Sequence, residues 1–382
     1  MRFVREGACC ALVMPTMDRA RRIVQTLQRI AQTPGPDIEA IVVDNGSLDG
    51  TPHKIREAFD NVTVIELGAN LGTAARNHGA RAAKAPVVLM LDDDSGPYPG
   101  TVEEICRRLQ DPSIGIIACP VVLPDGSFEE GGSRFVFIGC GAAFRRSVLL
   151  DIGEYPPEYE TYVEEYDVAY RFLLHDLAVV FPDQCRVWHE PQARGSFDYM
   201  VEKLIANNGF LAMKYFPRED AARFISWIVY RYSVFAQQKN AQAGFRRAME
   251  ALPDKCLRGL MQRQVLPDRV LDIVMPQRET LPRFIALAAE GVRKIAFLRA
   301  GKEIPDLLRA AREAGLSVEA IYEPPYGLFA EVGQLNGAPV YPLPRYDPKK
   351  FERLVIGGAS YGFIANTKRL AVDNHLTAVI VP

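Results

Sequence analysis

An apolar run that ends in three consecutive carboxylates is the feature that most constrains this fold. Residues 87–91 read Val-Val-Leu-Met-Leu, and Asp92, Asp93 and Asp94 follow before Ser-Gly-Pro. The run predicts a buried strand with the acids at its end. Three neighbouring carboxylates need water, basic side chains or a cation, because burying them alone is costly. Two interpretations stay open here: a solvated acidic turn, and a metal–diphosphate site, since Mg²⁺ commonly bridges carboxylates to phosphates.

The composition is that of an ordinary globular protein with material for two or three domains. The chain has 382 residues, 48% hydrophobic and 24% charged, and a formal net charge of −2, which argues against a nucleic-acid partner. Seven cysteines without a CxxC pair indicate reduced thiols and a cytoplasmic compartment. The charged N-terminus and the lack of an apolar stretch of about 18 residues argue against a signal peptide or membrane span. We expect a soluble protein, with association at the inner face of the membrane left open.

Strands and helices alternate through the first hundred residues. Strands are predicted at residues 9–14, 38–43 and 62–67, with a helix between the first two. This order is typical of a parallel α/β unit, in which ligands bind beyond the carboxyl ends of the strands. Polar residues follow each strand, and their convergence on one rim favours the metal site over the solvated turn. For residues 44–51, a turn with a helix N-cap remains the alternative.

Four short motifs, in this order, resemble those of family 2 glycosyltransferases of the GT-A fold, over about the first 215 residues. They are Val13-Met14-Pro15-Thr16, Asp44-Asn45-Gly46-Ser47, Asn70-Leu71-Gly72 with Arg76, and Leu91-Asp92-Asp93-Asp94. The resemblance implies a nucleotide-sugar donor, with Asp44 on the nucleobase and with Thr16 and Arg76 lining the nucleotide pocket. The residues expected to bind the donor are Pro15, Thr16, Asp44, Asn45, Asn70, Gly72, Arg76, Asp92 and Asp93.

The resemblance also makes Asp92 and Asp94 a DxD motif for Mn²⁺ or Mg²⁺. Asp94 is expected to be the direct ligand, and Asp92 to lie closer to the ribose or to reach the metal through water. Strand alternation would turn Asp93 away and make it replaceable. His189 resembles the family histidine that contacts metal or diphosphate, with a structural histidine as the alternative. Arg194, in the segment 194–196, could add a positively charged side chain beside the diphosphate. A bound cation would neutralise the charge that develops on a departing diphosphate.

A second acidic cluster holds the candidates for the general base. In a helix beginning near residue 162, Glu164, Asp167 and Arg171 fall on one face, where acids near the N-terminus also suit the helix dipole. The family carries Glu-Asp here, and its second acid is the base, so Glu165 is the aligned residue, one methylene longer. The base assignment stays open between Glu165, Glu164 and Asp167. An inverting transferase needs such a carboxylate to deprotonate the acceptor.

The rest of the chain is predicted to form a connector and a second α/β domain. The predicted domains are a catalytic domain at 1–215, a helical connector at 216–284 and a Rossmann-like domain at 285–382. A hairpin is expected to lead to a strand at 135–138, and short helical pieces are expected at 239–282. The aromatic-rich segment 224–235 could lie on a membrane surface or pack against the catalytic domain, and the second interpretation is favoured.

The predicted C-terminal domain resembles the N-terminal nucleotide-sugar-binding domain of bacterial sugar O-acetyltransferases. The resemblance rests on Asn336-Gly337-Ala338-Pro339-Val340 and on Leu354-Val355-Ile356-Gly357-Gly358. Its first turn, residues 299–303, is not a full GxGxxG, which weakens a phosphate-binding role. A regulatory, ligand-sensing or assembly role is therefore favoured over a second active site. A final strand is expected at 377–381.

The leading hypothesis is an inverting, metal-dependent glycosyltransferase. Asp44 favours UDP- or dTDP-sugars, because a carboxylate can accept from the pyrimidine N3–H. The acceptor stays open between a glycan, a lipid-linked sugar and a small molecule, and homo-oligomer formation is also open. The alternatives are a sugar-phosphate nucleotidyltransferase and a nucleotide-sugar sensor without turnover.

Overall fold

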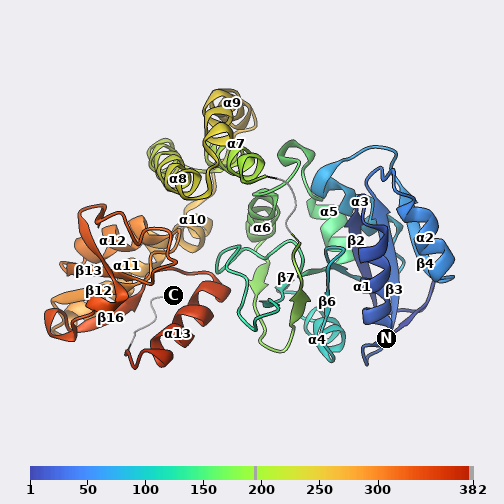
Figure 1. Cartoon of the computed structure of the whole chain (residues 1–382), viewed down its shortest axis with the longest axis horizontal. Helices are drawn as coiled ribbons and strands as arrows, with labels where there is room; N and C mark the ends of the chain where they lie inside the picture. Colours follow the sequence, from blue (N-terminus) through green and yellow to red (C-terminus); the bar gives the residue numbers. More distant parts are fainter. Residues whose placement is uncertain (193–195, 378–382) are drawn as a thin grey trace. The chain divides into compact units, whose positions relative to one another are not determined.

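The computed structural model describes residues 1–192 and 196–377 (Figure 1). Its contacts divide the chain into two compact units, Met1–Arg194 and Gly195–Pro382. The first is a mixed α/β unit, and the second contains helices and a smaller sheet. The predicted fold class, α/β with a helical connector and a C-terminal sheet domain, is confirmed. The domain boundaries at 215 and 284 stay predictions.

The first unit is built on a sheet whose strands are mostly parallel. Its order is β1, β3, β2, β5, β9, β7, β10, with β4 paired to β3, and β9 runs antiparallel to both its neighbours. The strands are β1 Arg2–Phe3, β2 Cys10–Thr16, β3 Asp37–Asp44, β4 Val62–Glu66, β5 Val87–Met90, β7 Ile114–Ala118, β9 Ala142–Arg145 and β10 Ala178–Val180. The parallel strands β2, β3, β4 and β5 direct their carboxyl ends to one rim, as the sequence predicts.

Hydrophobic clusters cover both faces of this sheet. Leu12 and Met14 of β2 pack in one cluster with Leu27 of α1, and Val13 faces the opposite cluster with Ala75 of α3. Gly79 lets α3 approach closely, because a Cβ there would come within 2.3 Å of a Val13 methyl group. The helices of the unit are α1 Ala20–Gln32, α2 Thr51–Ala58, α3 Ala75–Ala82, α4 Thr101–Arg108, α5 Arg146–Ile152 and α6 Glu164–Leu174.

A small second sheet ties distant parts of the first unit together. It has the order β6 (Ser95–Pro97), β11 (Val187–His189) and β8 (Val121–Val122). In the antiparallel β6–β11 pair, His189 lies opposite Ser95, and the Glu190 N–H donates to the Asp94 carbonyl oxygen at 3.0 Å. This pairing brings His189 beside the acids, almost a hundred residues earlier in the chain.

The strand predicted at 135–138 is wrong. The described residues there form only an isolated bridge between Ser133 and Val136. Phe137 instead packs edge-on against Phe144 and Tyr155, with ring centroids 5.6 and 6.4 Å apart. The apolar residues therefore fill the core as irregular chain, which their hydrophobicity alone does not distinguish from a strand.

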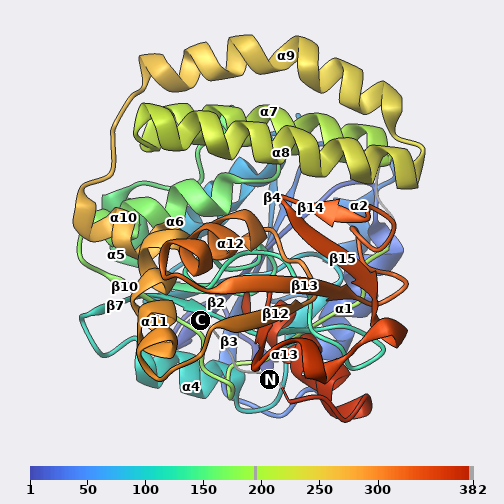
Figure 2. The same cartoon turned by 90° about the vertical axis from the view of Figure 1, so that its left-hand side faces the viewer.

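The second unit begins with long helices that run alongside one another (Figure 2). They are α7 Phe197–Tyr215, α8 Arg218–Lys239 and α9 Gln242–Met261, followed by α10 Asp268–Val274 and α11 Pro276–Ala289. The prediction of short pieces after residue 239 is wrong for α9, which continues through Pro253. Packing of α9 against α7 compensates for the backbone hydrogen bond that a proline removes.

Two aromatic residues of α8 contact other parts of the second unit. Trp227 donates from Nε1 to the Lys302 carbonyl oxygen at 2.7 Å and stacks on Phe329, with centroids 5.6 Å apart. Phe235 packs edge-on against Phe197 of α7 at 5.8 Å. The membrane-surface interpretation stays a prediction, as does packing of this segment against the catalytic domain. Among the described residues, no helix combines the length and apolar character needed to cross a bilayer.

The C-terminal sheet has the order β14, β15, β13, β12, β16. Its strands are β14 Gln334–Leu335, β15 Ala338–Pro342, β13 Ser317–Glu323, β12 Lys294–Leu298 and β16 Arg353–Ile356, and its helices are α12 Ile304–Glu313 and α13 Tyr361–Asp373. All strands but β14 are parallel, so the predicted Rossmann-like alternation is confirmed. The resemblance to acetyltransferase domains stays a prediction, and the strand predicted at 377–381 lies outside the described residues beyond its first residue.

Close contact between α7 and α9 depends on glycine. A Cβ on Gly244 would lie 2.0 Å from the Asp198 carbonyl oxygen, whereas one on Gly209 would meet the movable end of Leu252 at 2.3 Å. We expect Gly244→Ala to destabilise the protein by about 1–3 kcal/mol, because backbone atoms must separate. Gly209→Ala is the matched control, with a smaller loss. Thermal unfolding of both variants tests this, and an unchanged Tm for Gly244→Ala would contradict it.

Candidate functional site

The three acids follow the carboxyl end of β5, as the sequence predicts, but their environments differ. The Asp92 side chain is 34% exposed, and its carboxylate pairs with Arg76 at 2.5 Å. Asp94 is buried and pairs with Arg19 at 2.8 Å. Burial tends to lower the pKa of the Arg76 guanidinium, but the carboxylate of Asp92 and others nearby hold that pKa above its usual value. Arginines from two other segments thus balance part of the acid charge.

Asp93 is the most buried of the three. Its carboxylate accepts from the Thr16 hydroxyl at 2.8 Å and lies 3.3 Å from Arg19 Nε, while its carbonyl oxygen accepts from Thr26 at 2.7 Å. The strand alternation that was expected to turn Asp93 away does not extend to it, and its replaceability stays a prediction. The strand ends at Met90 and the acids lie in a turn, so alternation does not apply to them. Arg19, which the sequence analysis did not single out, lies against both Asp93 and Asp94.

The polar residues after β3 and β4 organise the neighbouring part of the rim. The amide of Asn45 donates to the Gly72 carbonyl oxygen at 3.1 Å and accepts from the Leu71 N–H at 3.0 Å. Asn70 accepts from the Gly72 N–H at 2.8 Å. A Cβ on Gly72 would lie 2.0 Å from the Glu160 carbonyl oxygen. Asn45, Asn70 and Gly72 therefore shape this loop, and their role in donor binding stays a prediction.

His189 stands between two carboxylates. Its Nδ1 lies 2.7 Å from Glu129 Oε2, and its Nε2 lies 3.3 Å from Asp94 Oδ1. Burial tends to lower the pKa of the imidazole, but hydrogen bonds with Asp94, Cys140 and Glu129 raise it strongly overall. Glu129 was missed from the sequence, because it lies in an irregular segment without periodicity or motif.

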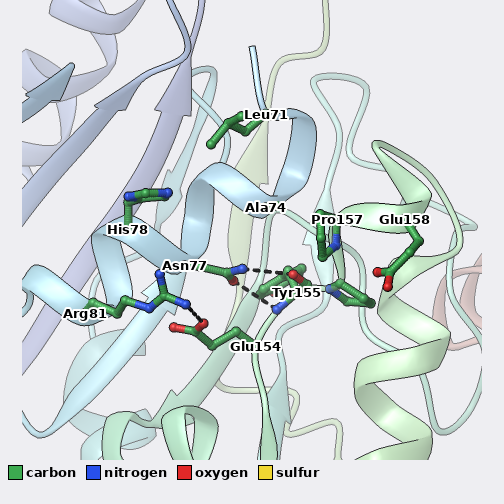
Figure 3. Close-up of a pocket in the computed structure, with 10 residues that line it drawn as sticks. Leu71, Ala74, Asn77, His78, Arg81, Glu154, Tyr155, Pro157 and Glu158 are labelled. Atoms are coloured by element: carbon green, nitrogen blue, oxygen red, sulfur yellow. Dashed lines mark hydrogen bonds and ion pairs between the residues drawn. The ribbon is translucent and has the colours of Figure 1, made fainter. Parts of the chain in front are cut away.

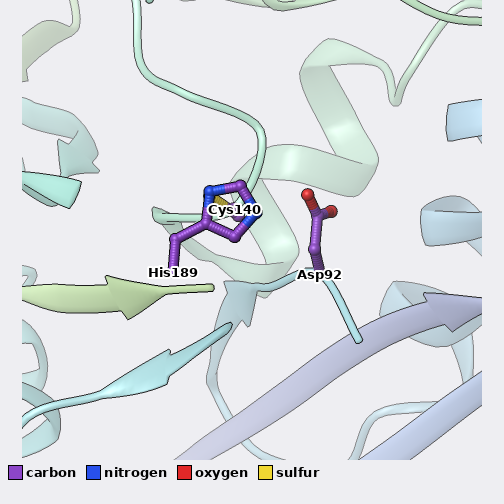
Figure 4. A group of neighbouring side chains, drawn as sticks. All are labelled: Asp92, Cys140 and His189. Atoms are coloured by element: carbon purple, nitrogen blue, oxygen red, sulfur yellow. The ribbon is translucent and has the colours of Figure 1, made fainter. Parts of the chain in front are cut away.

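Asp92, Cys140 and His189 form a cluster that could hold a metal ion (Figure 4). One donor atom from each, an oxygen, a sulfur and a nitrogen, lies within 4.8 Å of the others. Metal–ligand bonds of about 2.0–2.3 Å place two ligands of one ion up to about 4.5 Å apart, so the cluster fits a divalent cation after small shifts. Cys140 was not predicted as a ligand, and burial raises the pKa of its thiol to about 12. Asp94 as the direct ligand stays a prediction.

Several buried polar atoms of the first unit lack a hydrogen-bond partner within the described residues. Buried polar groups are normally paired, so an unpaired one at the rim is available to a ligand or ion. The unpaired atoms include Asp44 Oδ1, Arg76 Nε, Tyr155 Oη and Glu164 Oε2. Asp44 keeps its other oxygen on the Ser47 N–H at 3.0 Å.

The candidates for the base separate into two environments. Asp167 is fully buried and accepts from Arg171 Nε at 2.8 Å and from the Tyr159 hydroxyl at 3.1 Å. Glu165 is half-buried, and its Oε1 and Arg76 Nη2 both lie near Gly139, 3.2 and 3.7 Å from the position of a Cβ there. Glu164 is buried at the start of α6. The choice of the base among Glu165, Glu164 and Asp167 stays a prediction.

The chain before α6 is strained. Glu160, Tyr162 and Val163 have φ values of 60°, 64° and 77°, which are unfavourable for side chains other than glycine, most of all for a β-branched one. Such strain persists only where the surrounding contacts enforce it, and it concentrates at functional sites. Here it sets the direction in which α6 presents Glu164 and Glu165.

Replacing Glu164 should stabilise the protein at alkaline pH. Burial, and then the charge of Glu165, raise the pKa of Glu164 well above its usual range. The stability that follows from the raised pKa of Glu164 is fully present below the unfolded pKa of about 4.3. It is lost as the pH rises through the folded pKa. We expect Glu164→Gln to raise Tm at pH 8 but not near pH 4, with the exposed Glu158→Gln as control. Parallel Tm–pH curves for wild type and Glu164→Gln would contradict this.

A pocket of about 450 Å³ lies beside this region, between α3 and the segment 154–158 (Figure 3). Arg81 and Glu154 form an ion pair at its wall, and Asn77 holds the backbone of Tyr155 through bonds of 2.8 and 2.9 Å. None of the predicted site residues lines it. Tyr155 joins the two regions, because its ring lies 5.8 Å from the Arg76 guanidinium.

Comparison with known proteins gives a family match over part of the first unit. Residues 11–134 match the model described as glycosyl transferase family 2. Glycosyltransferase AglE of Haloferax volcanii is 32% identical over 168 residues, which cover 38% of this chain and 55% of AglE. The uncharacterized glycosyltransferase YwdF of Bacillus subtilis is 25% identical over 203 residues, covering 51% of this chain and 70% of YwdF. The chain thus spans little more than half the length of AglE.

A solved mannosyltransferase from Pyrobaculum calidifontis, in complex with GDP-Man and Mn²⁺, aligns with 82% of this chain and 87% of its own, at 18% identity and a TM-score of 0.44. Thr16, Asp44, Arg76 and the three acids all lie within the segment that matches the family model. The resemblance to family 2 glycosyltransferases is therefore confirmed for residues 11–134, the part of the first unit that carries the predicted donor-binding motifs.

Proposed function

We propose that the first unit is an inverting, metal-dependent glycosyltransferase that uses a nucleotide-sugar donor. The observation that carries the proposal is the meeting, at one rim of the sheet, of a cluster that could hold a cation, two arginines and a pair of buried or half-buried glutamates. A departing diphosphate needs the positive charges, and an incoming acceptor needs the carboxylate. The family match of residues 11–134 supports the same class of reaction.

Asp44 is proposed to read the nucleobase. Its Oδ2 is held by the Ser47 N–H, while the buried Oδ1 lacks a hydrogen-bond partner within the described residues. A carboxylate oxygen in this state can accept from the N3–H of uracil or thymine, which supports UDP- or dTDP-sugars as donors. Thr16, paired with Asp93, and Arg76, paired with Asp92, would border the phosphates.

The cation would be held by Asp92 and His189, with Asp94 close by. Mn²⁺ or Mg²⁺ bound there supplies a Lewis acid that neutralises charge on the leaving diphosphate. Arg76 and Arg19 keep positive charge beside the same group, and the Arg76 side chain also donates to the Gly139 carbonyl oxygen at 3.4 Å. This bond would help to keep the guanidinium in place while the phosphates bind and leave.

Glu165 is proposed as the general base. It would take the proton of an acceptor hydroxyl as that oxygen attacks the anomeric carbon from the side opposite the departing nucleotide. Glu164 beside it is buried with a raised pKa and suits a neutral, hydrogen-bonding role. The acceptor is proposed only as a hydroxyl-bearing glycan, lipid-linked sugar or small molecule.

A panel of UDP-, dTDP- and GDP-sugars with Mn²⁺ or Mg²⁺, with and without candidate acceptors, tests the proposal. Transfer, or slow hydrolysis of one donor class, is the expected result. Tight donor binding without turnover under any of these conditions would favour the nucleotide-sugar sensor. Pyrophosphate release from a nucleoside triphosphate and a sugar phosphate would favour the nucleotidyltransferase.

A further inference from the structure

We propose that Cys140 is a thiolate ligand of the cation in the first unit, which makes this a mixed oxygen, nitrogen and sulfur site that prefers Zn²⁺, Co²⁺ and Mn²⁺ over Mg²⁺. The proposal rests on the proposed function for the place of the cation, and it adds a ligand and a metal preference that the DxD pattern does not contain. Within the described residues, Asp92, Cys140 and His189 are the one group of three such side chains that could hold an ion.

The backbone around Cys140 places its sulfur beside Asp92 and His189. Cys140 lies between two glycines just before β9, and it is 1% exposed. The chain is held on both sides of it, by Arg76 bonded to the Gly139 carbonyl oxygen at 3.4 Å and by the Cys119 N–H bonded to the Gly141 carbonyl oxygen at 2.7 Å. Cys140 is thus fixed beside Asp92 and His189, whereas a cysteine buried only for packing would have apolar neighbours.

Glu129 completes the arrangement. A metal-binding histidine usually donates its second ring N–H to a carboxylate, which fixes the tautomer and turns the other nitrogen to the metal. The Nδ1 of His189 lies 2.7 Å from Glu129, and its Nε2 faces Asp94 at 3.3 Å. With Glu129 on Nδ1, the nitrogen left for the cation is the one on the side of the acids. Glu129 is therefore a positioning residue of the same site.

The ligand set determines which ions bind well. Thiolates favour borderline and soft ions, imidazole suits several transition metals, and a site of oxygens alone suits Mg²⁺. When the cation binds, the sulfur–metal bond forms, the S–H bond breaks and the proton leaves to solvent. Affinity should therefore increase in the order Mg²⁺, Mn²⁺, Co²⁺, Zn²⁺.

Titration of the full-length, reduced, metal-free protein with Co²⁺ tests the proposal by absorption spectroscopy. A thiolate bound to Co²⁺ produces an intense sulfur-to-metal charge-transfer band in the near ultraviolet, which oxygen and nitrogen ligands do not. Wild type and Cys256→Ser, a cysteine variant in the second unit, should show the band. Cys140→Ser should lose it and bind Zn²⁺ at least about tenfold more weakly while its Mg²⁺ affinity changes little.

Wild type alone can overturn the proposal, so the result does not depend on the folding of a variant. Co²⁺ bound without the charge-transfer band, or no Co²⁺ binding, would exclude a thiolate ligand. Sugar transfer is measured on the same preparations with Mg²⁺ and Mn²⁺. A protein that transfers sugar without the band refutes this inference alone, and a protein with the band that acts on no donor refutes only the proposed function.

Discussion

Glu165→Gln is expected to lower turnover by about 10²–10⁴ while the KM for the donor changes little. The amide keeps the size of the side chain but cannot take a proton from the acceptor. Steady-state kinetics with saturating donor and acceptor measure the effect, and binding of the nucleoside diphosphate by calorimetry checks that the donor pocket is intact. Because Gln is nearly isosteric and Glu165 is only half-buried, the fold should tolerate the change.

The exposed Glu158→Gln is the matched control for Glu165→Gln, since it removes a carboxylate outside the rim and should leave turnover unchanged. Unchanged turnover in Glu165→Gln would move the base to Glu164. Asp167→Asn provides a third comparison, because Asp167 is bonded to Arg171 and Tyr159. Its main effect should be a lower Tm.

Asp92→Asn is expected to abolish measurable cation binding and to lower transfer at least about 10²-fold. The change removes the oxygen charge from the cluster with Cys140 and His189 and leaves Arg76 without its partner at 2.5 Å. Electron paramagnetic resonance of free Mn²⁺ measures the binding. Asp125→Asn, in the exposed turn at 124–126, serves as the control.

Asp93→Asn should behave differently from Asp92→Asn. Asp93 is fully buried against Thr16 and Arg19. Its neutralisation should therefore mainly lower Tm, with only a small effect on the cation affinity. Normal cation binding in Asp92→Asn, or loss of binding confined to Asp93→Asn, would contradict the assignment of Asp92 to the metal.

The rim could be predicted because it depends on local patterns. Strands such as β2 and β5 are continuous apolar runs, and the residues after them lie at a common edge whenever the strands are parallel. The position of Asp92 and of Asp44 follows from that geometry. The sequence could not distinguish the three acids, since their different burial depends on where Arg19, Arg76 and Thr16 lie.

Cys140 and Glu129 could not be predicted as part of the site, because long-range pairing brings them there. Both lie between β8 and β9 in chain without a hydrophobic period, and they meet His189 only because β11 pairs with β6 and β8. The wrong prediction of a strand at 135–138 also results from long-range packing, because the apolar residues there fill the core as irregular chain. In α9, Pro253 suggested a break, but tertiary contacts with α7 outweighed the local preference.

The bond between Trp227 and Lys302, with the stacking of Trp227 on Phe329, has a consequence for modularity. These contacts make the long helices and the C-terminal sheet share one apolar interior. In a chimera that joins two proteins near residue 284, the Trp227 indole of the helical part and the Phe329 ring of the sheet would lose their contact and become exposed. Recombination that preserves solubility should therefore exchange residues 196–377 as one cassette.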